Sequence, residues 1–134
     1  MSQPAVTVAL DLLPGEFAVV RLAPDVALPA WACEGAFWSL TRTRDEVSVV
    51  CLAAQVPAGE RSAAGWRLLR FEGPFPFSAI GILASVAAPL AQAEISLMAL
   101  STFDTDYLLV QADRLEAAQA ALLAAGHRVR RADA

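Results

Sequence analysis

The sequence has few of the residues from which metal sites are built. Its 134 residues include one histidine and two cysteines. Cys33 and Cys51 are far apart and stand among apolar neighbours, so they match no zinc-ligand spacing and predict buried thiols. The single histidine, His127, is predicted to be a surface or internally satisfied side chain rather than a ligand. We therefore expect no metal and no cofactor.

Motifs of covalent catalysis and phosphate binding are also missing. No Gly-x-Ser-x-Gly elbow is present, and a cysteine–histidine pair has no motif to support it. No glycine-rich loop has the Walker or dinucleotide spacing, although Gly73 and Gly81 flank a loop and a helix start. Because no base, nucleophile or metal set is visible, the sequence predicts that the protein is not an enzyme.

Positive charge and long apolar runs are scarce as well. The net charge is −4, which opposes binding to nucleic acid. Arg128, Arg130 and Arg131 stand beside Asp133, and we interpret this cluster as a solvated tail. No apolar stretch approaches the ~20 residues that span a bilayer, so no membrane partner is expected. Met1–Pro4 lacks a basic residue, which opposes a secretory signal, and with so few cysteines a cytoplasmic protein is expected.

What the sequence does have is a large share of apolar residues. Hydrophobic residues make up 57% of the chain and charged residues 18%, as in a globular, core-rich protein. The length suits one compact domain or two very small ones. Part of the apolar excess is expected at a subunit interface, and we expect a homodimer.

The first half of the chain predicts short strands without a long helix. Pro14-Gly15 between two apolar runs is a typical hairpin signal. The strands are expected at residues 6–13, 16–22, 35–41 and 46–53. The polar segment Pro57–Ser62 is expected to be a linker, so residues 1–62 form a degenerate N-terminal unit and residues 63–134 a complete one.

The second half predicts the order βαββαβ, the ferredoxin-like arrangement. Two prolines make residues 73–77 a loop, after which Ser78 can cap a helix to about Gln92. Pro89 is expected to kink that helix or end it near Ala88. Asp113 is expected to cap a second helix that Gly126 terminates. The strands are expected at residues 66–72, 94–102, 106–112 and 127–131, and the second helix at 114–125.

A weak internal repeat links the two halves. Residues 39–50 align without gaps on residues 99–110, each as a strand, a polar tip and a strand. The alignment matches Thr41 with Ser101 and Glu46 with Asp106, which indicates duplication of a ββ core.

In the second half, the loop at 73–82 and the tip Ser101–Asp106 can both border the start of the first helix. Free backbone N–H groups there favour an anion such as an α-carboxylate, and Asp104 or Asp106 can accept hydrogen bonds from an ammonium or a basic side chain. Phenylalanines supply apolar walls, namely Phe75, Phe77 and Phe103. Two interpretations stay open, because aspartates are also common turn residues and phenylalanines common core residues.

Three segments resemble a known family. Phe71–Ser78, Ile80–Ser85 and Leu100–Val110 are similar to the ACT domain group related to the CASTOR arginine sensors and to aspartate kinase regulatory domains. Ser39–Thr43 with Asp45-Glu46 resembles the first unit of the same group. The resemblance implies an α+β fold of tandem ACT units, with the first unit degenerate and antiparallel sheets that carry helices on one face.

The resemblance also implies a site. ACT domains are regulatory modules that bind amino acids, usually where two such units meet. It implies Thr102 and Phe103 as pocket lining, Asp106 as the acidic partner of an amino or basic group, and Gly73–Ser78 as a loop that closes over the ligand. The expected ligand-binding residues are Gly73, Phe75, Phe77, Ser78, Ser101, Thr102, Phe103, Asp104 and Asp106.

The resulting prediction is a sensor that binds a small molecule, an amino acid, without catalysis and acts on an unknown protein target. This chain has two units, whereas the related sensors have four, so a pocket between units would need the internal pair or a dimer to complete it. The ligand can therefore differ from that of the sensors, and arginine is one candidate. The alternative is an oligomerising interaction module that has lost its ligand. A small enzyme is the third hypothesis.

Overall fold

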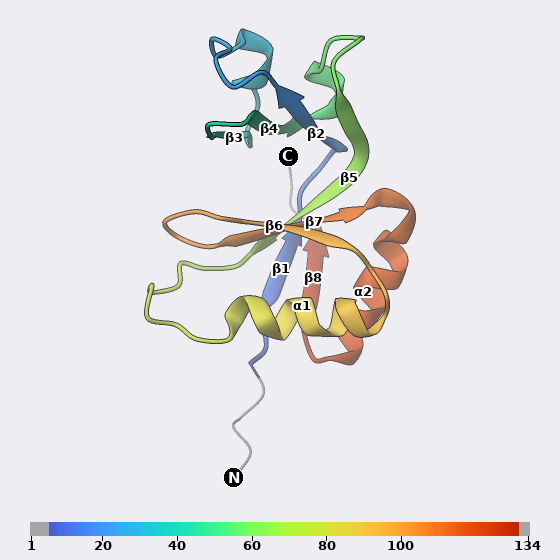
Figure 1. Cartoon of the computed structure of the whole chain (residues 1–134). Coiled ribbons are helices and arrows are strands. Elements are labelled where there is room, and N and C mark those ends of the chain that lie inside the picture. Colours follow the sequence, from blue (N-terminus) through green and yellow to red (C-terminus); the bar gives the residue numbers. More distant parts are fainter. Residues whose placement is uncertain (1–5, 132–134) are drawn as a thin grey trace. The chain divides into compact units, whose positions relative to one another are not determined.

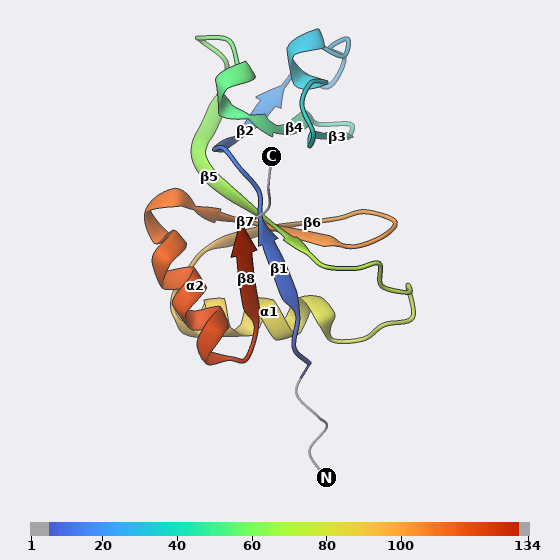
Figure 2. The ribbon, with the colours of Figure 1, turned by 180° about the vertical axis from the view of Figure 1, so that it is seen from behind.

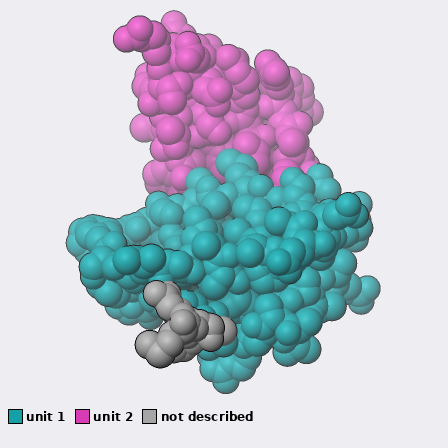
Figure 3. Space-filling model, turned by 60° about the horizontal axis from the view of Figure 1, so that its bottom comes forward, with its two compact units in different colours: residues 1–14, 67–134 teal, residues 15–66 magenta. Residues whose placement is uncertain are grey.

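The structure is a computed structural model that describes residues 6–131, and it divides into two compact units. Unit 1 comprises residues 1–14 and 67–134, and unit 2 comprises residues 15–66 (Figure 3). The sequence-based division placed residues 1–62 together, whereas the first strand pairs within unit 1. Met1–Pro4 and Asp133, on which two predictions rested, lie outside the described residues.

Unit 1 has the predicted βαββαβ order with one strand added (Figure 1). The added strand is β1 (Ala9–Leu12), which lies antiparallel to the end of β5 (Ser62–Phe71) and parallel to β8 (Arg128–Arg131). The strands of this unit therefore run in the order β6-β7-β5-β1-β8. The remaining elements are α1 (Ile82–Gln92), β6 (Leu97–Ser101), β7 (Asp106–Gln111), the 3₁₀ helix η3 (Ala112–Arg114) and α2 (Leu115–Ala124).

The predicted hairpin around Pro14-Gly15 is wrong. β1 and β2 (Phe17–Leu22) do not pair with each other in the described structure; each pairs with a different part of β5, as Leu10 opposite Phe71 and Phe17 opposite Trp66 show. β5 has ten residues, enough to serve both strands in turn. The local turn signal therefore yields to pairing with a long partner strand.

The core of unit 1 lies between the sheet and its two helices, which cover the same face (Figures 1 and 2). Leu10, Phe71 and Leu108 of the sheet are fully buried against Val86 and Leu122 of the helices. Side chains alternate between the two faces of a strand and recur on one face of a helix at i, i+4, so these two periods direct apolar side chains to a common core. Within residues 6–131, no helix is long and apolar enough to cross a bilayer.

His127 is part of this core and is satisfied, as predicted. It is 1% exposed, its Nδ1 accepts a hydrogen bond from the Val8 N–H (3.0 Å), and its Nε2 lies 2.8 Å from the Ser85 carbonyl oxygen. Because Nδ1 accepts, Nε2 carries the proton and donates to Ser85. The ring thereby joins the approach to β1, the start of β8 and helix α1.

Pro89 does not end α1, which continues to Gln92. A proline has no N–H, so the carbonyl four residues earlier, that of Ser85, loses its usual helical donor. The His127 Nε2–H donates to that carbonyl instead. The helix therefore continues past the proline with its unpaired carbonyl satisfied from another element.

Both predicted helix caps are wrong. The cap position of α1 is Gly81, with φ of 83°, a left-handed conformation that favours glycine. Ser78 lies earlier, in an exposed loop where the Ala79 N–H donates to the Pro76 oxygen. Asp113 lies within η3, which leads directly into α2, so the backbone turn occupies the place of a capping side chain. Gly126 follows α2, as predicted.

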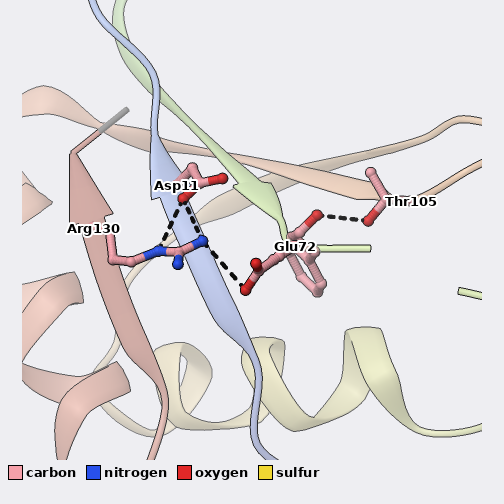
Figure 4. A network of polar contacts seen from close by, with 5 residues as sticks. Asp11, Glu72, Thr105 and Arg130 are labelled. Atoms are coloured by element: carbon pink, nitrogen blue, oxygen red, sulfur yellow. Dashed lines mark hydrogen bonds and ion pairs between the residues drawn. The ribbon is translucent and has the colours of Figure 1, made fainter. Parts of the chain in front are cut away.

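The arginine cluster is not a solvated tail. Residues 128–131 form β8, and Arg130 lies 3.0 Å from Asp11 on β1 and 3.2 Å from Glu72 beyond β5 (Figure 4). These carboxylates raise the pKa of Arg130, with the Asp11 hydrogen bond as the largest cause. Arg130 therefore helps to hold an edge strand.

Unit 2 is a small antiparallel sheet without an α-helix among its described residues. Its strands run in the order β3-β4-β2, with β2 next to the start of β5. Ala18, Val20, Val49 and Cys51 are buried in its apolar cluster. The other elements are η1 (Ala30–Ala32), β3 (Ser39–Arg42), β4 (Val47–Leu52) and η2 (Ala53–Gln55). The predicted lack of a long helix in this half is confirmed.

Candidate functional site

A hollow of about 390 Å³ lies in unit 1 between the tip of the β6–β7 hairpin and the loop that leads into α1. Both segments extend to the same side of the unit, left in Figure 1 and right in Figure 2. Among the described residues that line the hollow, Asp104 and Asp106 are the charged ones. The hollow is therefore acidic at the tip and apolar along the loop and helix.

The hairpin tip is a four-residue turn between Ser101 and Asp106, which pair with each other in the ladder. The Thr102 N–H donates to the Thr105 carbonyl (2.8 Å), and the Thr102 hydroxyl donates to the same oxygen (3.1 Å). The Ser101 hydroxyl donates to Asp106 Oδ1 at 2.6 Å. That bond fixes one oxygen of the Asp106 carboxylate, while the Asp104 side chain lies on an exposed residue.

The loop opposite the tip is attached to it near its start. The Phe75 N–H donates to the Asp104 carbonyl oxygen at 2.8 Å. The Thr105 hydroxyl donates to the Phe71 carbonyl oxygen, also at 2.8 Å (Figure 4). Gly73 lies so close to Thr105 that an added Cβ would stand 3.1 Å from the threonine Cβ and Oγ1.

Two aromatic side chains join the loop and the tip at the surface. Phe77 and Phe103 meet edge to face, with ring centroids 4.8 Å apart. They are 76% and 79% exposed, and the neighbouring Ile80 is 90% exposed. Large exposed apolar side chains gathered around one hollow are typical of a binding surface.

Helix α1 begins at the inner end of the hollow. Gly81 and the first three helical residues, Ile82, Leu83 and Ala84, are part of its lining. The first intrahelical bond runs from the Ser85 N–H to the Gly81 carbonyl, so the three N–H groups before it have no partner within the helix. Such groups favour an anion.

Seven of the nine predicted site residues line this hollow; they are Phe75, Phe77, Ser101, Thr102, Phe103, Asp104 and Asp106. Gly73 instead lines a smaller hollow of about 200 Å³ with Arg70, Pro74 and Tyr107. Ser78 is exposed and lines neither of the two. Whether any of these residues contacts a ligand stays a prediction.

Sequence reasoning included the start of α1 in the site but missed Thr105. Thr105 is buried, at 9% exposure, although it is the last residue of a turn and follows the exposed Asp104. A β-branched residue among turn-forming ones was the available signal, because such a residue is usual in strands and unusual in turns. The sequence predicts the cap of α1 at Ser78, whereas the structure has it at Gly81.

The tip of unit 2 repeats that of unit 1 with an offset of one residue. Arg42 pairs with Val47, so the four-residue turn is Thr43–Glu46. The Thr43 N–H donates to the Glu46 carbonyl (2.8 Å), and the threonine hydroxyl contacts the same oxygen (3.3 Å). The structural match of Thr102 is thus Thr43, whereas the gapless alignment paired Thr102 with Arg42.

Metal-binding groups do not gather at either tip. Within residues 6–131, no group of three or more histidine, cysteine, aspartate or glutamate side chains could hold a metal ion. Cys51 is buried, which raises the pKa of its thiol, and Cys33 is half-buried.

Comparison with known proteins matches both units separately. An ACT domain model matches residues 61–124, and a model described as an N-terminal domain matches residues 15–59. The cytosolic arginine sensor for mTORC1 subunit 1 of Homo sapiens is 47% identical over 49 residues, which are 36% of this chain. That match covers 15% of the sensor's own length.

Solved structures extend the likeness over nearly the whole chain. Protein Atu0741 from Agobacterium tumefaciens is 41% identical, covers 97% of both chains and gives a TM-score of 0.91. The regulatory subunit of aspartate kinase from Thermus thermophilus, at 12% identity, covers 91% of this chain and 99% of its own with a TM-score of 0.61. The second likeness shows the fold alone. The chain has a mixed α+β fold of tandem units, and its residues 61–124, which contain the ferredoxin-like elements from the end of β5 to α2, belong to the ACT domain family.

Proposed function

We propose that this chain is a non-catalytic regulatory protein that binds an amino acid in the hollow between the hairpin tip and the loop before α1. The observation that carries the proposal is the arrangement of complementary groups around one space. Asp104 and Asp106 lie at one side and the start of α1 at the other, with Phe75 and Phe77 among the lining residues. An α-amino acid has an ammonium, a carboxylate and a side chain to match these three surfaces.

The expected orientation follows from charge. The carboxylate of the ligand accepts from the N–H groups of Ile82–Ala84, and its ammonium or a basic side chain donates to Asp106 or Asp104. Because the charged lining residues are both acidic, a ligand with a cationic side chain is favoured over one with an acidic side chain. The similarity to an arginine sensor makes L-arginine the first ligand to test.

We further propose that a second copy of the chain completes the site and that the protein works in the cytoplasm. Phe77 and Phe103 line the hollow, Ile80 lies in the same loop, and each of the three residues is more than three quarters exposed. A homodimer that places an ACT unit of its partner over these residues would bury them. The same exposed aromatics favour the second candidate function, an oligomerising interaction module that binds no ligand.

Thermal unfolding with each of the twenty amino acids tests the proposal. A ligand at about 100 times its Kd stabilises the folded state by ~2.7 kcal/mol, which raises Tm. We expect one or a few amino acids to do so, and the shift to disappear in Asp106→Ala. Asp113→Ala is the matched control, because it removes a carboxylate from an exposed residue outside the hollow.

The two candidate functions predict different results in that experiment. No shift with any amino acid, together with a dimer in solution, would support the interaction module and contradict ligand binding. A shift that survives in Asp106→Ala would contradict a role for that carboxylate, and one that also survives when Asp104 and Asp106 are both replaced by alanine would contradict a ligand at the tip.

A further inference from the structure

We propose that Thr105 is the positioning residue of the site: its buried hydroxyl holds the hairpin tip where the tip can anchor the loop across the hollow. The inference rests on the proposed function for its meaning, because the hollow formed by tip and loop is the proposed ligand site. The anchoring itself does not depend on any ligand.

The loop has little else with which to attach itself near its start. Pro74 and Pro76 have no N–H, so Phe75 carries the one backbone donor of residues 74–76. That donor bonds to the Asp104 carbonyl oxygen at 2.8 Å. The position of the Asp104 carbonyl therefore decides where the start of the loop lies.

Thr105 is the next residue in the chain, and its hydroxyl fixes that carbonyl. The hydroxyl donates to the Phe71 carbonyl oxygen at 2.8 Å, from a residue that is 9% exposed. Phe71 belongs to β5 and is fully buried, so the tip is tied to the rigid core of unit 1. Buried hydrogen bonds of this kind are costly to break, because the groups left behind cannot reach water.

The strand end to which Thr105 bonds is itself held from the other side. The Glu72 N–H donates to the Ala9 carbonyl at 2.8 Å, and the Glu72 carboxylate lies 3.2 Å from Arg130 (Figure 4). Gly73 packs directly against Thr105, so the backbone of Gly73 cannot move closer to the tip. Residues 71–73 are thus fixed on two sides, whereas every residue from 76 to 81 is exposed.

Unit 2 shows the same turn without this device. Glu46 occupies the position that corresponds to Thr105; it is half-buried and has no hydroxyl to donate. The tip carbonyl of Asp45, which corresponds to Asp104, accepts from the Arg21 Nη2 at 3.0 Å. The buried threonine and the loop anchor therefore occur together in the unit that has the hollow.

Amide hydrogen exchange of Phe75, followed by NMR without ligand, tests the anchoring directly. We expect Thr105→Val, which keeps the shape and removes the hydroxyl, to raise the Phe75 exchange rate about fivefold. Thr105→Ser keeps the hydroxyl and is expected to leave the rate close to that of the unchanged protein. Thr43→Val, in the matching turn of unit 2, is the control for losing a tip hydroxyl.

Gly73→Ala provides a second route to the same result if Thr105→Val fails to fold. Its new Cβ presses on Thr105, so the Phe75 exchange rate is again expected to rise. An unchanged Phe75 rate in a folded Thr105→Val, or in a folded Gly73→Ala where the first variant does not fold, overturns the proposal.

Titration with L-arginine separates this inference from the proposed function. If both hold, Thr105→Val weakens L-arginine binding about fivefold and speeds Phe75 exchange. If Phe75 exchange responds and no amino acid binds the unchanged protein, the anchor stands and the proposed function fails. If L-arginine binds equally to both proteins while Phe75 exchange is unaltered, the ligand site stands and the anchor fails.

Discussion

The two hairpin tips of this chain have the same turn and different supports. Each has a threonine at its first position whose N–H and hydroxyl contact the carbonyl three residues later. In unit 1 two further hydrogen bonds attach the tip to the rest of the unit, one donated by the backbone N–H of Phe75 and one by the buried Thr105 hydroxyl. In unit 2 the corresponding hydrogen bond is donated by the long, exposed side chain of Arg21.

The difference shows how one turn can serve either a site or a simple strand connection. A backbone donor on a separate loop leaves a space between tip and loop, and in unit 1 that space is the hollow. A side-chain donor from the neighbouring strand β2 reaches the tip across the surface of its own sheet. The turn is thus shared, and what stands behind it differs.

The largest expected effect on stability comes from His127, a buried polar side chain of unit 1. His127→Ala removes the partners of the Val8 N–H and the Ser85 carbonyl and leaves a cavity, so we expect the free energy of unfolding to fall by about 3 kcal/mol. Urea unfolding followed by far-ultraviolet circular dichroism, which reports on α1 and α2, measures it. Arg128→Ala, an exposed neighbour, is the control.

The same substitution in a Pro89→Ala background tests the reason for that loss. Alanine restores an N–H that can donate to the Ser85 carbonyl, so His127→Ala should cost about 1 kcal/mol less there. Equal losses in both backgrounds would mean that the histidine does not compensate for the proline.

A smaller effect is expected in the apolar core of unit 2. Cys51→Ser places a hydroxyl at a position with 0% exposure and should lower the free energy of unfolding by about 2 kcal/mol. Cys33→Ser, at a half-buried position, should change it by less than about 0.5 kcal/mol. Tryptophan fluorescence measures both, because Trp31, Trp38 and Trp66 all lie in unit 2.

Alkaline pH gives an independent check of the Cys51 prediction. Burial raises the pKa of the Cys51 thiol, so the unfolded chain releases this proton at a lower pH than the folded one. Stability should therefore fall as pH rises from the ordinary thiol pKa through the raised one. Cys51→Ser should lack that part of the decline, and a decline of equal size in both proteins would contradict the burial.

The sequence was informative where the signal is local. Glycine and proline positions, apolar periodicity and the polar tip at 102–105 were enough to predict the βαββαβ order of unit 1 and its two hairpin strands. Seven predicted site residues come together because they lie on two segments that this topology brings to one end of the sheet.

It was uninformative where a distant partner decides. The turn signal at Pro14-Gly15 could not reveal that β5 is long enough to pair with both flanking strands. Pro89 suggested a helix end, since nothing nearby indicates that His127, far along the chain, would supply a donor. The repeat was aligned by residue similarity, and the ladder that fixes the true register differs by one position.

The smallest expected effect concerns the support of the unit 2 tip. Arg21→Ala removes the hydrogen bond to the Asp45 carbonyl, and because that carbonyl lies at an exposed turn, water can replace the lost donor. We expect the free energy of unfolding to fall by about 0.5 kcal/mol, measured by tryptophan fluorescence in urea. Arg44→Ala, an exposed arginine in the same turn, controls for the lost charge.

A loss as large as that of Cys51→Ser would mean that both tips depend for their stability on a donor from outside the turn. A loss no greater than the control would mean that the unit 2 turn is held by Thr43 and its ladder alone, and that only the tip of unit 1 requires anchoring.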